Sequence, residues 1–87
     1  MKNGENKVIL VIDDDEEICE ELRMILEDEN YDVDVTSSPS EGIKEIDKTR
    51  YDILLLDLKM REIDGAQILQ YVKNKHHQIK VVLLTAC

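Results

Sequence analysis

Apolar residues along this chain follow two patterns that alternate with each other. Four short segments are continuous or alternating runs of aliphatic and β-branched residues, a pattern typical of strands. Between them, three longer segments place apolar residues three or four positions apart, which indicates helices with one buried face. The predicted strands are Lys7–Ile12, Tyr31–Thr36, Tyr51–Leu56 and Lys80–Leu84, and the predicted helices run from 16 to about 29, 39 to about 49 and 65 to about 75.

Each predicted helix follows a residue that can cap it. Asp15, Ser38 and Asp64 carry side-chain oxygens that can accept hydrogen bonds from the first turn. Pro39 suits the first position of the second helix, and Glu41 completes a capping box with Ser38. The order is therefore strand and helix in strict alternation.

The helical stripes are interpreted as core contacts and not as partner grooves. Cys19 is expected to be half-buried in the packing of the first helix. His76 and His77 are expected to be exposed at the end of the third helix, where positive charge is favourable. The stripe predicted for the first helix is Ile18, Leu22, Ile25 and Leu26, and that of the third is carried by Leu69 and Val72.

Strands that alternate with single helices predict an α/β fold with a mostly parallel sheet. In such sheets, ligands bind outside the carboxyl ends of the strands. Asp13 and Asp14 directly follow the first predicted strand, Asp57 follows the third and Thr85 follows the fourth. If these strands are neighbours, the three carboxylates meet in one crevice.

Three carboxylates in one crevice repel each other strongly. Two unit charges ~4 Å apart cost about 4 kcal/mol at an effective dielectric constant near 20. The cluster therefore either takes up protons or holds a cation. Carboxylate oxygens, a backbone carbonyl and retained waters are the ligands that Mg²⁺ prefers. With the metal present, one aspartate can act as a nucleophile toward phosphorus, and the Thr85 hydroxyl can hydrogen-bond a phosphoryl oxygen.

Composition narrows the class of protein. The 87 residues suit one domain, 1–87, and the net charge of −9 argues against a nucleic-acid groove. No apolar stretch approaches the ~20 residues that span a bilayer, so we expect no membrane partner. No signal peptide is predicted, and two cysteines form no disulfide framework, so a cytoplasmic location is expected. The three glycines form no phosphate-cradling loop, which argues against a nucleotide site.

Four motifs in order resemble the receiver domain of two-component response regulators. They are VILVIDDD at 8–15, LLLDLKM at 54–60, DG at 64–65 and VVLLTA at 81–86. The resemblance implies a flavodoxin-like (CheY-like) doubly wound parallel sheet with strand order 2-1-3-4. It also implies a phosphoacceptor signalling domain, not an enzyme that turns over a separate substrate.

The resemblance further implies a role for each site residue. Asp57 is the phosphoacceptor and takes a phosphoryl group from a sensor histidine kinase in a Mg²⁺-dependent reaction. Asp14 binds Mg²⁺ directly, Asp13 binds it through water, and Asp57 and the backbone carbonyl of Lys59 complete the protein ligands. Thr85 is the switch hydroxyl, and phosphorylation changes the affinity for a partner.

The sequence departs from the family pattern in two places. Arg61 stands where a proline commonly follows the methionine of the loop, so that loop is expected to be less rigid. The family continues with a fourth helix, a fifth strand and a fifth helix, whereas the printed sequence ends at Cys87 without the family's phosphoryl-binding lysine and aromatic switch residue. We therefore expect an incomplete receiver domain in which Lys80–Leu84 forms an uncovered apolar edge that favours a homodimer.

Two alternative functions are kept open. The Asp13-Asp14-Asp15 run also suits a haloacid-dehalogenase-like phosphatase with Asp13 as the nucleophile, although this leaves Asp57 and the Asp64-Gly65 pair unexplained and needs a longer chain. Alternatively, the chain is an inactive truncated receiver that acts as a binding or dimerisation fragment. The position of a phosphoryl group, or its absence, distinguishes the three.

Overall fold

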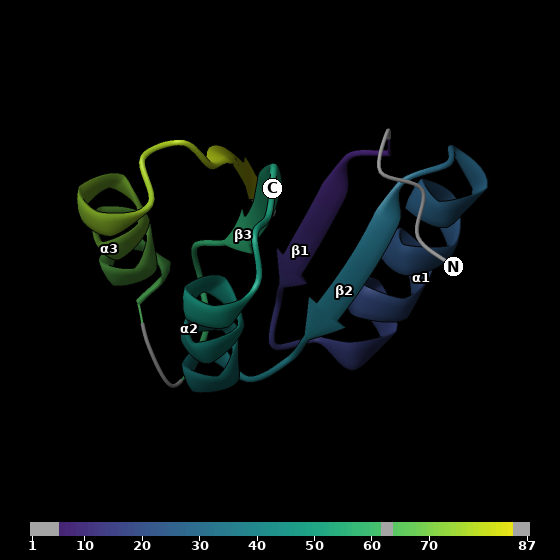
Figure 1. The fold of residues 1–87 in the computed structure, drawn as a ribbon. Helices are drawn as coiled ribbons and strands as arrows, with labels where there is room; N and C mark the ends of the chain where they lie inside the picture. Colours follow the sequence, from purple (N-terminus) through teal and green to yellow (C-terminus); the bar gives the residue numbers. More distant parts are fainter. Residues whose placement is uncertain (1–5, 62–63, 85–87) are drawn as a thin grey trace.

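The protein alternates strands and helices as the hydrophobic pattern predicts (Figure 1). The computed structural model describes residues 6–61 and 64–84. The predicted boundaries hold within about two residues, which is the usual uncertainty of helix and strand ends. The elements are β1 (Val8–Ile12), α1 (Glu16–Asp28), β2 (Asp32–Thr36), α2 (Pro39–Lys48), β3 (Ile53–Asp57), α3 (Gly65–Lys75) and β4 (Lys80–Leu84).

The four strands form one parallel sheet with the order β2-β1-β3-β4. This confirms the flavodoxin-like order 2-1-3-4. Helix α1 covers one face of the sheet, and α2 and α3 cover the other (Figure 1). The register pairs Ile12 of β1 with Leu56 of β3, so the residues that directly follow both positions emerge side by side at one edge.

Two hydrophobic layers hold the helices on the sheet. Successive side chains of a strand point to opposite faces, so each central strand contributes to both layers. The scarcity of aromatic residues makes these layers almost wholly aliphatic. The α2/α3 side contains Leu10, Ile12, Ile46, Leu54, Leu56, Ile68 and Val72, and the α1 side contains Ile9, Val11, Cys19 and Val33.

The predicted caps are present at all three helix starts. Asp15 accepts hydrogen bonds from two backbone N–H groups of α1, and Asp64 accepts one from α3. The Ser38 hydroxyl oxygen accepts a hydrogen bond from the backbone N–H of Glu41. The other half of the predicted capping box is wrong: the backbone N–H of Ser38 donates to Thr36 Oγ1, and the Glu41 side chain pairs with Lys44 at 3.3 Å on the outer surface of the helix.

The stripe predicted for α1 is only partly a core contact. Ile18 is 41% exposed and Ile25 is 60% exposed, whereas Cys19 is fully buried. Leu22 and Leu26 pack against the sheet with Cys19, so the helix is rotated toward Cys19 relative to the prediction. The cause is tertiary: α1 packs mainly against β1 and β2, which leaves one flank of the stripe uncovered among the described residues.

His76 is less exposed than predicted. Its side chain is 20% exposed, and its Nε2 lies 2.9 Å from Asp47 Oδ1 of α2. The Tyr71 hydroxyl donates to both oxygens of the same carboxylate. The end of α3 is therefore tied to the end of α2, a contact between distant segments that the sequence pattern does not show.

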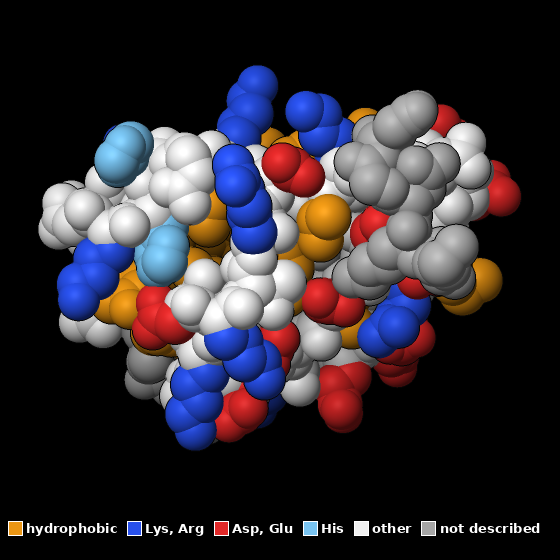
Figure 2. Space-filling model, in the orientation of Figure 1, with side chains coloured by type: hydrophobic (Ala, Val, Ile, Leu, Met, Phe, Trp, Pro, Cys, Tyr) orange, Lys and Arg blue, Asp and Glu red, His pale blue; other side chains and the backbone are white. Residues whose placement is uncertain are grey.

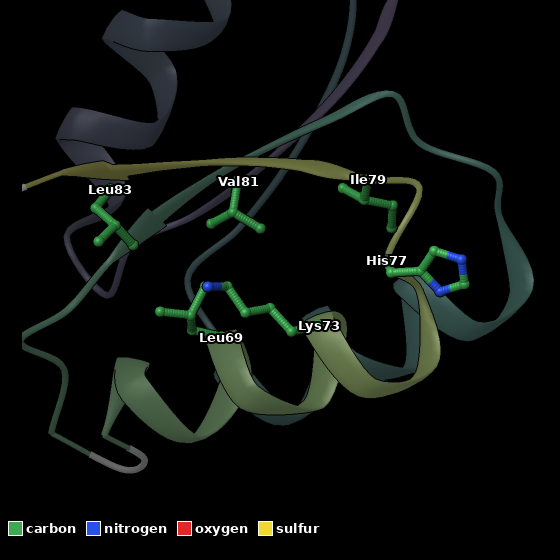
Figure 3. A pocket seen from close by; sticks show the side chains of 6 residues that line it. All are labelled: Leu69, Lys73, His77, Ile79, Val81 and Leu83. Carbon is green, nitrogen blue, oxygen red and sulfur yellow. The ribbon is translucent and has the colours of Figure 1, made fainter.

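The surface around α2 and α3 is charged, with both signs interspersed and histidine side chains on the α3 side (Figure 2). At the sheet edge, Val82 and Leu83 of β4 are each 41% exposed, in agreement with the expected apolar edge. An open groove separates α3 from β4, and Leu69 and Val81 face each other across it (Figure 3). Among the described helices, none has the length and apolar character to cross a membrane.

Candidate metal centre

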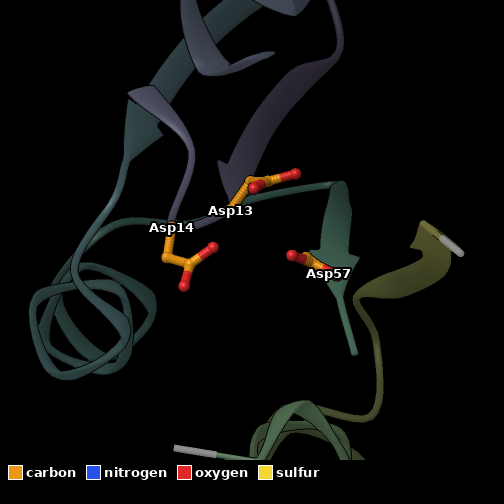
Figure 4. Close-up of side chains that lie close together, drawn as sticks. All are labelled: Asp13, Asp14 and Asp57. Atoms are coloured by element: carbon orange, nitrogen blue, oxygen red, sulfur yellow. The ribbon is translucent and has the colours of Figure 1, made fainter. Parts of the chain in front are cut away.

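Three carboxylates converge at the carboxyl edge of the sheet (Figure 4). Asp13 and Asp14 follow β1 directly, and Asp57 is the last residue of β3. One oxygen from each side chain lies within 4.8 Å of the other two. The structure thus brings together the three acids that the sequence predicted to meet.

Asp13 is held rigidly in the fold. It is only 5% exposed, and its Oδ1 accepts a hydrogen bond of 2.9 Å from the backbone N–H of Asp15. Its own backbone N–H donates to the carbonyl of Thr36, and the Cys19 thiol donates to its carbonyl oxygen. Cys19 therefore packs beneath the site and fixes the backbone that carries the carboxylate.

The surroundings of Asp13 disfavour its charge. Burial raises the pKa of the Asp13 carboxyl above its ordinary value, and the Asp15 N–H opposes this in part. The carboxylates of Asp57 and Asp14 raise the pKa further. A cation among these groups would remove the repulsion and favour the ionised form.

Asp57 is oriented by the loop that follows it. Its Oδ1 accepts a hydrogen bond of 3.0 Å from the backbone N–H of Lys59. The start of α3 approaches this loop very closely, because a Cβ at Gly65 would lie 2.5 Å from the backbone oxygen of Asp57 and 2.6 Å from Leu58 Cα. A glycine is required there for the helix and the acid to be neighbours.

Asp14 has a cationic partner that sequence reasoning missed. The Nε and the backbone N–H of Arg61 each lie 3.2 Å from Asp14 Oδ2. From the sequence, Arg61 was noted only because it stands where the family commonly has a proline, and no contact with an acid was predicted for it. The signal available was its place four residues after Asp57, in a loop at the same edge of the sheet as Asp14.

The donor set fits a small divalent cation. The site offers carboxylate oxygens at the ends of two adjacent strands, and all three clustered side chains are aspartates. Such hard oxygen ligands, with room for water, suit Mg²⁺. The crevice beside them is lined by the acids and by the apolar residues Ile18, Leu22, Leu83 and Leu84.

The roles predicted for the site residues stay predictions, including those of Asp13, Asp14 and Asp57, and two further groups are not placed by the cluster itself. The backbone N–H of Lys59 contacts Asp57, which places the residue beside the site, but the role of its carbonyl as a metal ligand is not tested by this contact. Thr85 lies outside the described residues. Leu84, which precedes it, pairs with Asp57 across β3 and β4.

Comparison with known proteins decides the family. The family model described as the response regulator receiver domain matches residues 9–87. The chain belongs to this family. The receiver's curated relatives include two from Bacillus subtilis (strain 168): the transcriptional regulatory protein ResD, 38% identical over 90% of this chain, and the alkaline phosphatase synthesis regulator PhoP, 32% identical over 93%. This receiver spans 32% of ResD and 34% of PhoP, about a third of each relative.

Solved structures agree with this assignment of the receiver. The response regulator TrrA from Thermotoga maritima, in complex with Mg²⁺ and BeF, superposes with a TM-score of 0.88 at 34% identity, over 93% of this chain and 70% of that one. A CheY-like receiver domain protein from Methanospirillum hungatei superposes with a TM-score of 0.91 at 28% identity, over 94% and 66%. Both likenesses support the CheY-like fold described above.

Proposed function

We propose that this receiver is a phosphoacceptor switch in which Asp57 takes a phosphoryl group from a histidine kinase. The observation that carries the proposal is the convergence of Asp57 with Asp13 and Asp14 within 4.8 Å. The carboxylate of Asp57 forms a bond to phosphorus while the bond from phosphorus to the kinase histidine breaks, and the imidazole nitrogen leaves. The Lys59 N–H donates to Asp57 Oδ1 and so restricts the orientation of a carboxylate that lines the crevice.

Asp13, Asp14, Asp57 and the Lys59 carbonyl would hold Mg²⁺, the metal to which this donor set is suited. When bound, the metal neutralises the charge of the acids and of the phosphoryl oxygens. Asp13 is held in place whether or not the metal is bound, because it is buried and accepts a hydrogen bond from the backbone N–H of Asp15. Thr85 would supply the hydroxyl that contacts the phosphoryl group.

A histidine kinase is the partner that this proposal requires. Support comes from a solved structure of the histidine kinase ThkA in complex with TrrA, whose regulator chain superposes here with a TM-score of 0.85 at 35% identity. On this chain, the exposed Ile18 of α1 lies beside the acids in the same crevice. A cytoplasmic location is part of the same proposal, and no turnover of a separate substrate is proposed.

The phosphatase alternative requires Asp13 to attack phosphorus. Asp13 is the least accessible of the three acids, and burial raises the pKa of its carboxyl, which disfavours the ionised form that attacks phosphorus. Asp57 is half-buried and lies at the open crevice. Attack by Asp57 is therefore the better use of this geometry.

Intact mass spectrometry tests the proposal. The protein is incubated with acetyl phosphate and Mg²⁺, with Asp57→Asn and Asp13→Asn as parallel samples. We expect one phosphoryl increment in the wild type and none in Asp57→Asn, and peptide mapping should place it on Asp57. An increment on Asp13 would support the phosphatase, and no increment with intact Mg²⁺ binding would support an inactive binding fragment.

We also propose that the exposed edge of β4 pairs two copies of the chain. Val82 and Leu83 are exposed on an edge strand, and such edges favour pairing with another strand. Sedimentation velocity across a concentration series should show a dimer that Val82→Lys dissociates. A monomer at every concentration would refute the pairing and leave the phosphoacceptor proposal untouched.

A further inference from the structure

Arg61 is the cationic side chain that contacts the acid cluster within residues 6–61 and 64–84. Both its Nε and its backbone N–H lie 3.2 Å from a single oxygen, Asp14 Oδ2. The Asp14 side chain is 23% exposed, whereas that of Arg61 is 88% exposed. The guanidinium therefore reaches a half-buried carboxylate from solvent and can leave it without disturbing any packing.

We propose that Arg61 competes with Mg²⁺ for the Asp14 carboxylate and so weakens metal binding at this site. The inference rests on the proposed function, because it assumes that the metal binds at Asp13, Asp14 and Asp57. The arginine supplies positive charge to a cluster of three acids that would otherwise repel each other. The metal supplies more charge at the same place, so one cation displaces the other.

The two cations do not share the site for electrostatic reasons. Once a divalent ion lies among the acids, the net charge that the guanidinium meets is no longer strongly negative, and the ion itself repels it. A metal ion also takes up electron pairs of carboxylate oxygens to which the arginine donates. Metal binding therefore releases the Arg61 side chain into solvent.

The same displacement affects the loop between β3 and α3. Arg61 belongs to this loop, and its backbone N–H is bonded to the same Asp14 oxygen as its side chain. Weakening that bond loosens a link between this loop and the end of β1. Occupancy of the metal site is thus transmitted to the segment that follows the phosphoacceptor.

Mg²⁺ titration of wild type, Arg61→Ala and Arg50→Ala tests the competition. An exposed ion pair such as Arg61–Asp14 has a small free energy, and this is the free energy that Mg²⁺ must overcome to displace the arginine. Arg61→Ala is therefore expected to bind Mg²⁺ about two- to fivefold more tightly than wild type. Arg50→Ala is the matched control, because it removes the same charge before β3, at the end opposite Asp57. Calorimetry with MgCl₂ as the only ligand gives the three affinities.

Nuclear magnetic resonance reports the contact itself. The Nε–H signal of Arg61, assigned by its loss in Arg61→Ala, is expected to shift with added Mg²⁺ along the same binding curve as the backbone of Asp14. The Arg50 signal should not follow that curve. Equal or weaker Mg²⁺ binding by Arg61→Ala, or an Arg61 signal that ignores Mg²⁺, would overturn the competition.

Asp14→Ala separates this inference from the proposed function. If wild type binds Mg²⁺ and Asp14→Ala does not, the metal site stands whatever the result for Arg61. If wild type itself binds no Mg²⁺, both the metal site and the competition at Asp14 are refuted.

Discussion

Asp13→Asn is expected to stabilise the protein when no metal is present. The substitution removes the charge of the most buried acid and keeps an oxygen that can accept the Asp15 N–H bond. At 4.8 Å, the limit that the clustered oxygens do not exceed, two unit charges repel by about 3.5 kcal/mol at an effective dielectric constant of 20 and by about 0.9 kcal/mol in bulk water. Asp13 loses two such pairs, one with Asp14 and one with Asp57.

The net gain is smaller than the sum of these pairs. Asp14 and Asp57 are half-buried, which places the effective dielectric constant above 20, and the Asp15 N–H bond favours the charge of Asp13. We therefore expect the free energy of unfolding to rise by about 1 to 3 kcal/mol at pH 7 in EDTA. Urea unfolding followed by circular dichroism measures this difference.

The pH dependence has a definite sign. Because the pKa of Asp13 is raised in the folded state, the native protein keeps this proton to a higher pH than the unfolded chain. Wild type therefore loses stability as pH rises from the unfolded value, about 3.9, through the folded value. Asp13→Asn lacks this loss, so its advantage should appear across that window and vanish below it.

Mg²⁺ should reduce the advantage of Asp13→Asn. A ligand at 100 times its dissociation constant stabilises a protein by about 2.7 kcal/mol, and the variant lacks one of the proposed ligands. Asp28→Asn, at the exposed end of α1, is the control and should change stability by less than about 0.5 kcal/mol. If Asp13→Asn is less stable than wild type at pH 7 in EDTA, repulsion does not dominate the site and the argument fails.

Three further predictions concern contacts that hold the helices and strands of the fold together. Tyr51→Phe removes a buried hydroxyl that donates to Asp34 at 2.8 Å, so the free energy of unfolding in urea should fall by about 1 to 2 kcal/mol, and no change would mean that water replaces the bond. Gly65→Ala should lower stability by about 1 to 3 kcal/mol and also impair labelling by acetyl phosphate, because its Cβ meets backbone. The control Gly42→Ala meets side chains only, those of Ile12 and Thr36, and should keep normal labelling. Hydrogen bonds from Tyr71, then His76, lower the pKa of Asp47, so this group stabilises the protein above the unfolded value and the benefit is lost as pH falls toward the folded value. Asp47→Asn should therefore show a shallower decrease of melting temperature between pH 5 and pH 2 than wild type, and identical slopes would contradict the contribution of this contact.

The sequence by itself determined the order of the elements and the acids of the site. Strand runs such as Val8–Ile12 and caps such as Asp15 are local signals, because they depend on side-chain periodicity and on hydrogen bonds within one turn. The convergence of Asp13, Asp14 and Asp57 also followed, because parallel strands bring their carboxyl ends to one edge.

Only the tertiary structure decided which contacts close the site and which faces stay open. Arg61 meets Asp14 across 47 positions of sequence, and His76 meets Asp47 across 29, so no local pattern encodes either pair. The exposure of Ile18 and Ile25 likewise depends on contacts between segments that are distant in the sequence. Helical spacing defines a stripe, but the neighbours of the helix determine how much of that stripe is buried.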